Sequence, residues 1–154
     1  MSKSSQSGFT LLEMVCVLAL IGMMAAVLLP YVPRHTSRSR LQGYALQAAT
    51  LLKEDRNAAI RRGMNVATLV DAGSRVIRSG ATADMVRIPD DVHFEALLPR
   101  TCSRHEALST ISFFASGMSC GGSIALSRGD AGYEIRVNWL TGRIEIASRS
   151  YAIN

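Results

Sequence analysis

The chain has 154 residues, of which 48% are hydrophobic and 19% are charged, and its formal net charge is +5. This length leaves room for one domain of ordinary size besides a membrane anchor, so we expect one domain. A positive charge of this size is compatible with an anionic partner but does not require one.

A short polar leader is followed by a long apolar run. From Met14 to Pro33, 20 residues carry no formal charge, and a helix of that length covers the roughly 30 Å hydrocarbon core of a bilayer. No small-residue cleavage pattern closes the run, so we expect any cut to precede it. Cys16 lies within the run, where we interpret it as a lipid-facing or packing residue.

Glu13 is the one charged residue near the start of this apolar segment. A carboxylate at the edge of a bilayer costs roughly a few kcal/mol unless it is paired or hydrated, so it indicates a function by default. The alternative is that its side chain merely extends to the aqueous interface.

The stretch SGFTLLEMVCVLALIGMMAAVLLP resembles the processing and assembly segment of type IV pilins and type II secretion pseudopilins. The resemblance implies that a prepilin peptidase removes the leader, residues 1–8, by cutting between Gly8 and Phe9, and methylates the new amino group of Phe9. It also implies that Glu13 pairs with that amino group, within a chain or between chains, and draws a new subunit into register. Residues 9–33 are then the transmembrane and assembly helix.

Three arginines, Arg34, Arg38 and Arg40, follow the apolar run. They are interpreted either as a solvated face or as residues that contact lipid headgroups or neighbouring chains. By charge alone, the positive-inside rule places them in the cytoplasm. The resemblance implies the reverse, a single-pass protein of the bacterial inner membrane with residues 34–154 in the periplasm. We follow the resemblance, because its motif is more specific than a charge count.

A second helical pattern continues to Arg62. Apolar residues recur at spacings of three, four and seven and form one stripe, and Gly63 suits the left-handed conformation that ends a helix. We expect one helix from about Thr10 to Arg62, kinked or locally opened at Pro30 because proline removes a backbone donor. The predicted stripe is Leu41, Tyr44, Ala45, Ala48, Leu52 and Ala59.

Beyond Gly63 the hydrophobic period shortens to two, which predicts short strands in a β head over residues 64–154. The predicted strands are MNVATLV, SRVIRS, DMVRI, VHFEALL, TISFFA, GSIALS, YEIRVNW and RIEIA. In YEIRVNW, alternation predicts a buried face of Tyr133, Ile135, Val137 and Trp139 and a solvated face of Glu134, Arg136 and Asn138. The predicted fold is α+β and pilin-like: a long N-terminal helix, transmembrane in its first half and amphipathic in its second, packs on an antiparallel β-sheet head.

The β head is similar to the C-terminal signature of GspH-like and FimT-like minor pilins, through FFASGMSCGGSIAL and YEIRVNWLTGRIEI. Gly121 and Gly122 fit a turn, and residues 140–142 fit a tight hairpin. The chain departs from that signature at Ala115, where the family often has proline, and in its pair of cysteines.

Cys102 and Cys120 are predicted to form a disulfide if the head is outside the cytoplasm, and otherwise to be two free buried thiols. With His105 they offer three metal ligands but no fourth, so we predict no metal site. Ser119 lies in a G-x-S-x-G pattern, but a strand pattern follows it where a nucleophile elbow needs a helix. We therefore expect no catalytic residue, no cofactor and no enzyme.

The expected function is that of a minor pseudopilin, a structural subunit near the tip of the periplasmic pseudopilus that serves export of folded proteins across the outer membrane. Its expected partners are other major and minor pseudopilins, the prepilin peptidase and the inner-membrane assembly platform. The alternative is a FimT-like minor type IV pilin that binds DNA in pilus assembly or natural transformation. The arginines that could contact phosphates are Arg100, Arg104, Arg143 and Arg149, although a solvated surface is the simpler interpretation of them.

Overall fold

The computed structural model describes residues 10–28, 36–103, 105–107 and 109–150. It comprises two compact units, residues 1–34 and residues 35–154. The first contains helix α1 (Leu11–Leu28), and the second contains helix α2 (Arg38–Arg62) and the β head. Gly8, Phe9 and Pro30, which the sequence predicts as processing and kink residues, lie outside the described residues.

Helix α1 begins directly after Thr10. The Thr10 hydroxyl accepts a hydrogen bond from the Glu13 backbone N–H at 3.3 Å, which satisfies one of the free donors of the first turn. Among the described residues, no helix is both long and apolar enough to cross a membrane. The predicted membrane segment, residues 9–33, extends beyond the described part of α1 at both ends.

Helix α2 has its own start and end signals. Ser37 is extended (φ −72°, ψ 163°) and its side chain accepts a hydrogen bond from Arg40 N, while Gly63 is left-handed (φ 62°) and ends the helix as predicted. We predicted one helix to Arg62, kinked or locally opened at Pro30. The prediction is wrong at Thr36 and Ser37, which are not helical, because Ser37 caps a new helix there.

The head has two four-stranded antiparallel sheets, in the orders β3-β2-β1-β7 and β10-β9-β8-β4, and a small two-stranded sheet, β5-β6. The first contains β1 (Val66–Asp71), β2 (Val76–Arg78), β3 (Met85–Arg87) and β7 (Thr110–Phe113). The second contains β4 (His93–Leu97), β8 (Gly122–Arg128), β9 (Ala131–Val137) and β10 (Ile144–Ser150). The sequence pattern did not predict β5 (Thr101–Cys102) and β6 (His105–Glu106).

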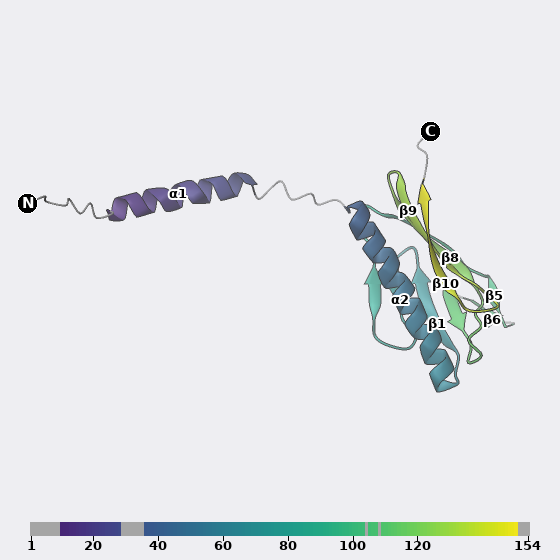
Figure 1. The fold of residues 1–154 in the computed structure, drawn as a ribbon. Helices are drawn as coiled ribbons and strands as arrows, with labels where there is room; N and C mark the ends of the chain where they lie inside the picture. Colours follow the sequence, from purple (N-terminus) through teal and green to yellow (C-terminus); the bar gives the residue numbers. More distant parts are fainter. Residues whose placement is uncertain (1–9, 29–35, 104, 108, 151–154) are drawn as a thin grey trace, which may run out of the picture. The chain divides into compact units, whose positions relative to one another are not determined.

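Helix α2 packs along the head and contacts strands of both larger sheets (Figure 1). The predicted stripe is confirmed, because Leu41, Ala45, Ala48, Leu52 and Ala59 are all buried and Tyr44 packs against the same core. The core consists of one face of α2 and the inner faces of the two larger sheets.

The predicted alternation of buried and solvated residues in YEIRVNW is wrong at two positions, Trp139 and Glu134. Trp139 is 63% exposed, because β9 ends at Val137 and the chain turns before Trp139. Glu134 was predicted on the solvated face but is only 7% exposed, because two arginine side chains cover its carboxylate. Ile135 and Val137 are buried as predicted.

Candidate functional site

Helix α1 carries an apolar surface on all sides. Every residue from 10 to 26 is exposed, and Glu13 is the one charged residue among them. A helix that is apolar all round is stable only when a membrane or other helices cover it. The exposed large side chains are Leu11, Leu12, Met14, Val15, Val17, Leu18, Leu20, Ile21, Met23 and Met24.

Glu13 lies in the first turn of α1, at the end of the helix where the backbone dipole favours a negative charge. Thr10 and Glu13 have the spacing of a capping box, and the Glu13 backbone N–H donates to the Thr10 hydroxyl. Its predicted partner, the amino group of Phe9, lies outside the described residues.

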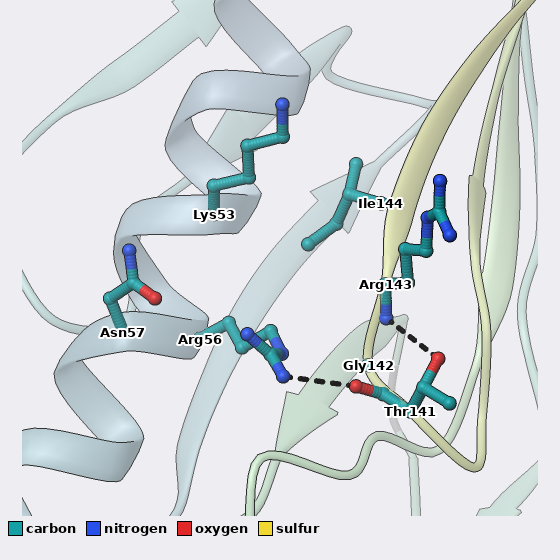
Figure 2. A pocket seen from close by; sticks show the side chains of 7 residues that line it. All are labelled: Lys53, Arg56, Asn57, Thr141, Gly142, Arg143 and Ile144. Atoms are coloured by element: carbon teal, nitrogen blue, oxygen red, sulfur yellow. Dashed lines mark hydrogen bonds between the residues drawn. The ribbon is translucent and has the colours of Figure 1, made fainter.

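A basic cleft separates α2 from the turn between β9 and β10. Lys53, Arg56 and Asn57 project from α2 on one side, and residues 141–144 form the other side of a cavity of about 470 Å³ (Figure 2). Arg56 bridges the cleft, because its Nε donates to the carbonyl oxygen of Gly117 at 3.1 Å and its Nη2 to that of Thr141 at 3.0 Å. A hydrogen-bonded arginine therefore holds the turn against the helix.

The outer surface of β9 and β10 carries a network of charges. Glu134 accepts a hydrogen bond from Arg136 at 2.8 Å and forms an ion pair with Arg149 at 2.7 Å, and Arg143 pairs with Glu145 at 2.9 Å. The hydrogen bond from Arg136, with the charges of both arginines, lowers the pKa of the Glu134 carboxyl from its usual value. The network ties the two strands together across the sheet.

The predicted DNA-contacting arginines do not share one environment. Arg143 and Arg149, at the two ends of β10, each pair with a carboxylate. Arg100 is exposed before β5 and lines a separate hollow with Glu106. Arg104 lies outside the described residues. Arg143 and Arg149 are therefore partly neutralised by neighbouring carboxylates.

Asp55 is a site that the sequence prediction missed. Its carboxylate is fully buried and accepts hydrogen bonds from the hydroxyls of Thr68 (2.6 Å) and Ser79 (2.5 Å) and from the backbone N–H groups of Gly80 (2.9 Å) and Ala81 (3.2 Å). The position of Asp55 between Leu52 and Ala59, on the apolar stripe, was the available signal. It connects α2 to β1 and to the loop after β2.

Thr36, the residue before the N-cap of α2, is hydrogen-bonded to the β head. Asp91 accepts from the Thr36 N–H at 2.7 Å and from its hydroxyl at 2.8 Å, and it forms an ion pair with Arg128 at 3.1 Å. The hydrogen bonds from Thr36, with the charge of Arg128, lower the pKa of the Asp91 carboxyl. Arg128 also donates to the carbonyl oxygen of Thr36. These contacts hold the first turn of α2 to the sheet.

The structure joins Cys102 and Cys120 in a disulfide with 5.7 Å between their Cα atoms. This bond uses both of the cysteine sulfur atoms that were considered, and set aside, as metal ligands in the sequence. In the described part of the chain, no group of three or more potential metal-binding side chains occurs. Ser119 is buried and its hydroxyl accepts from Gly121 N at 3.1 Å, and the following element is strand β8, so the turn is not a nucleophile elbow.

Comparisons with known proteins agree with this architecture. Residues 3–29 match the prokaryotic N-terminal methylation motif, and residues 45–142 match the family described as type II transport protein GspH. Type II secretion system protein H of Xanthomonas campestris pv. campestris is 29% identical over 139 residues, which are 89% of this chain and 80% of that protein.

Two solved structures share the fold at low sequence identity. The minor pseudopilin EpsH of the Vibrio cholerae type 2 secretion system superposes with a TM-score of 0.54 at 10% identity, over 73% of this chain and 97% of that one. The type IV minor pilin FimU of Pseudomonas aeruginosa superposes with a TM-score of 0.51 at 17% identity, over 73% and 91%. The fold is therefore common to secretion and pilus subunits and does not by itself separate them.

Proposed function

Because the chain belongs to the family of the type II transport protein GspH, we propose that it is a minor pseudopilin, a structural subunit of the type II secretion pseudopilus. The observation that carries the proposal is helix α1, which is apolar on all sides and has a single carboxylate, Glu13, in its first turn. Such a helix needs a membrane before assembly and a bundle of similar helices after it.

Processing at the N-terminus supplies the step between these two states. We propose that prepilin peptidase cuts between Gly8 and Phe9 and methylates Phe9, which leaves an amino group that can carry a positive charge. Glu13 is then the natural partner of that charge, either four residues away on its own helix or on a neighbouring subunit. Assembly, not catalysis, is the role that this arrangement supports.

The proposed location follows from the same segment. The unprocessed chain spans the bacterial inner membrane once through residues 9–33, with the head, residues 34–154, in the periplasm. There the chain meets the other pseudopilins and the inner-membrane assembly platform, and takes a place near the tip of the pseudopilus. The disulfide between Cys102 and Cys120 fits an oxidising compartment.

A DNA-binding minor pilin is the competing function. It gains support from the shared fold of the type IV minor pilin, but the pairing of Arg143 and Arg149 with carboxylates favours a structural surface over a phosphate-binding one. Binding to phosphates alone depends steeply on salt. A gel-retardation titration of the full chain with duplex DNA at low and moderate salt tests this alternative directly.

The proposed function is tested in the parent bacterium with a deletion of this chain and with an affinity-tagged copy that complements the deletion. We expect the deletion to block export of proteins across the outer membrane, and the tagged chain to co-purify with other pseudopilins and to begin with methylated Phe9. Normal export in the deletion strain together with lost DNA uptake would instead establish the competing function.

A further inference from the structure

The turn between β9 and β10, residues 138–143, exposes two large apolar side chains next to each other. Trp139 is 63% exposed and Leu140 is 54% exposed, whereas Ile135 and Val137 in the preceding strand are buried. A tight hairpin requires small or polar turn residues and does not require a tryptophan and a leucine. The two side chains therefore form an apolar surface that no described residue of the head covers.

The backbone of this turn is held in place by its surroundings. Asn138 Oδ1 accepts from the backbone N–H groups of Leu140 and Thr141, both at 3.0 Å, and Ser119 N donates to the carbonyl oxygen of Trp139 at 3.0 Å. Arg56 adds its bond to the Thr141 carbonyl oxygen (Figure 2). A partner that binds a preformed turn does not have to order it, which lowers the entropic cost of binding.

Positive charges flank the apolar pair. Arg136, Arg143 and Glu145 line a cavity of about 300 Å³ together with Trp139. The two arginines pair with Glu134 and Glu145, and their side chains remain 57% and 76% exposed. On the α2 side, Lys53 and Arg56 line the basic cleft. Tryptophan and arginine are the residues most enriched at the centres of protein interfaces. Around this centre the cations Arg136, Arg143, Lys53 and Arg56 outnumber the carboxylates Glu134 and Glu145. This excess of positive charge favours a partner with carboxylates.

We propose that Arg136, Trp139, Leu140 and Arg143, here called the turn surface, dock into an apolar groove rimmed by Asp or Glu side chains on a different subunit of the pseudopilus. This docking role rests on the proposed function, because it presumes an assembly with unlike subunits. A flexible polyanion is a poorer match, because the turn surface presents a rigid apolar pair between its arginines.

A second copy of this chain is the alternative occupant. The hollow between α2 and β3 is lined by Leu46, Met85, Glu54 and Asp84, which is the chemistry that the turn surface requires. If the turn surface of one copy bound the hollow of the next, the two contacting surfaces would differ, and each copy would leave one of them free. Such a contact adds copies without closing a ring, so it would produce filaments of this chain alone. A minor subunit does not need such a contact, and the test below distinguishes the two partners.

The test uses the full chain in the parent bacterium, with the photo-crosslinking residue p-benzoylphenylalanine in place of Leu140. We expect an adduct that maps to an Asp- or Glu-containing segment of another pseudopilin. The substitution Arg143→Glu should lower its yield about tenfold, the equivalent of about 1.4 kcal/mol, and changing the mapped carboxylate to Lys should restore the yield. Glu145→Gln is the matched control, because it removes only the ion-pair partner of Arg143 and should leave the adduct in place.

Placing the crosslinker at Met85, on the edge strand β3, provides the control for position and should not give the same adduct. The proposal is overturned by a yield that Arg143→Glu leaves unchanged, or by adducts to nucleic acid, to a segment without carboxylates or to a second copy. Co-purification of the same chains with other pseudopilins is measured in parallel. If they co-purify but the adduct does not depend on Arg143, the docking role fails and the proposed function stands; if they do not co-purify, the proposed function fails.

Discussion

Gly142 lies so close to Gly117 that a Cβ atom on Gly142 would come within 2.1 Å of the Gly117 carbonyl oxygen. The same Cβ would meet Arg56 Nε at 2.8 Å, and Gly142 itself has a left-handed backbone (φ 61°). Only glycine therefore allows the β9–β10 turn to approach the loop after β7 and the arginine that joins both to α2. The turn surface depends on this approach, because it positions Trp139 and Leu140.

Gly142→Ala is expected to lower the free energy of unfolding by about 3 kcal/mol, through the left-handed conformation and overpacking together. Gly129→Ala is the matched control, since Gly129 has nearly the same φ (59°) and no atom within 4 Å of its Cβ position. The control should cost only about 1 kcal/mol, for the left-handed conformation alone. Thermal unfolding of the purified full chain in detergent, followed by circular dichroism, measures both; equal losses would show that the contact with Gly117 is unimportant.

Asp55→Ala is expected to destabilise the head by about 3 kcal/mol, because it leaves two hydroxyls and two backbone N–H groups without their buried acceptor. The neighbouring Glu54 is exposed, so Glu54→Ala should change stability by less than about 0.5 kcal/mol. Hydrogen exchange of the Gly80 and Ala81 amides gives a local readout. Unchanged protection of these amides in Asp55→Ala would contradict the role of the carboxylate.

Helical and strand periods predicted the elements because burial repeats with the same period. Leu41, Ala45 and Leu52 are buried on one face of α2 for this reason. Trp139 was misplaced because an alternating pattern continues past Val137, whereas the strand ends there when the chain turns. A pattern of residue types does not mark where the hydrogen-bonded ladder stops.

Among the candidate site residues, some stand out in the sequence and others are recognised only from tertiary packing. Glu13 stands out in the sequence because it is a lone carboxylate in an apolar run, and its pairing with the processed N-terminus stays a prediction. The fit of Gly142 against Gly117 was not predictable, because it joins two loops that only tertiary packing brings together. Glu134 was also misassigned, since its burial depends on arginines from its own strand and from β10.

The lowered pKa of Glu134 predicts a loss of stability in acid. Because the folded-state pKa lies below the unfolded value of about 4.5, the stabilisation is fully present above pH 4.5 and is lost as pH falls through the folded-state pKa. The midpoint of thermal unfolding of Glu134→Gln should therefore lie below that of the unmodified chain at pH 6, and the difference should shrink below pH 4.5. Glu106→Gln, at an exposed position, serves as control, and a difference independent of pH would contradict the ion-pair network.

The disulfide predicts a thiol count that depends on reduction. The chain has three cysteines, and Cys16 is the free one within the described residues, so a thiol-reactive label should modify one residue before reduction and three after it. Replacing Cys102 and Cys120 by serine should lower the free energy of unfolding by about 3 kcal/mol, the magnitude typical for closure of a loop of this length. Cys16→Ser is the control and should leave the stability of the head unchanged; three labels without reductant would contradict the bond.

Glu13→Leu separates membrane insertion from assembly. The substitution makes the apolar segment more hydrophobic, so the chain should insert as before, yet it removes the carboxylate that we pair with the processed N-terminus. We expect incorporation into the pseudopilus to fall at least about tenfold, the equivalent of about 1.4 kcal/mol. Membrane fractionation measures insertion, and co-purification with other pseudopilins measures incorporation.

Cys16→Leu, at a neighbouring exposed position of α1, is the matched control and should assemble normally. Glu13→Gln keeps the shape of the side chain without its charge, so full incorporation of that variant would show that packing, and not the charge, accounts for the effect of Glu13→Leu.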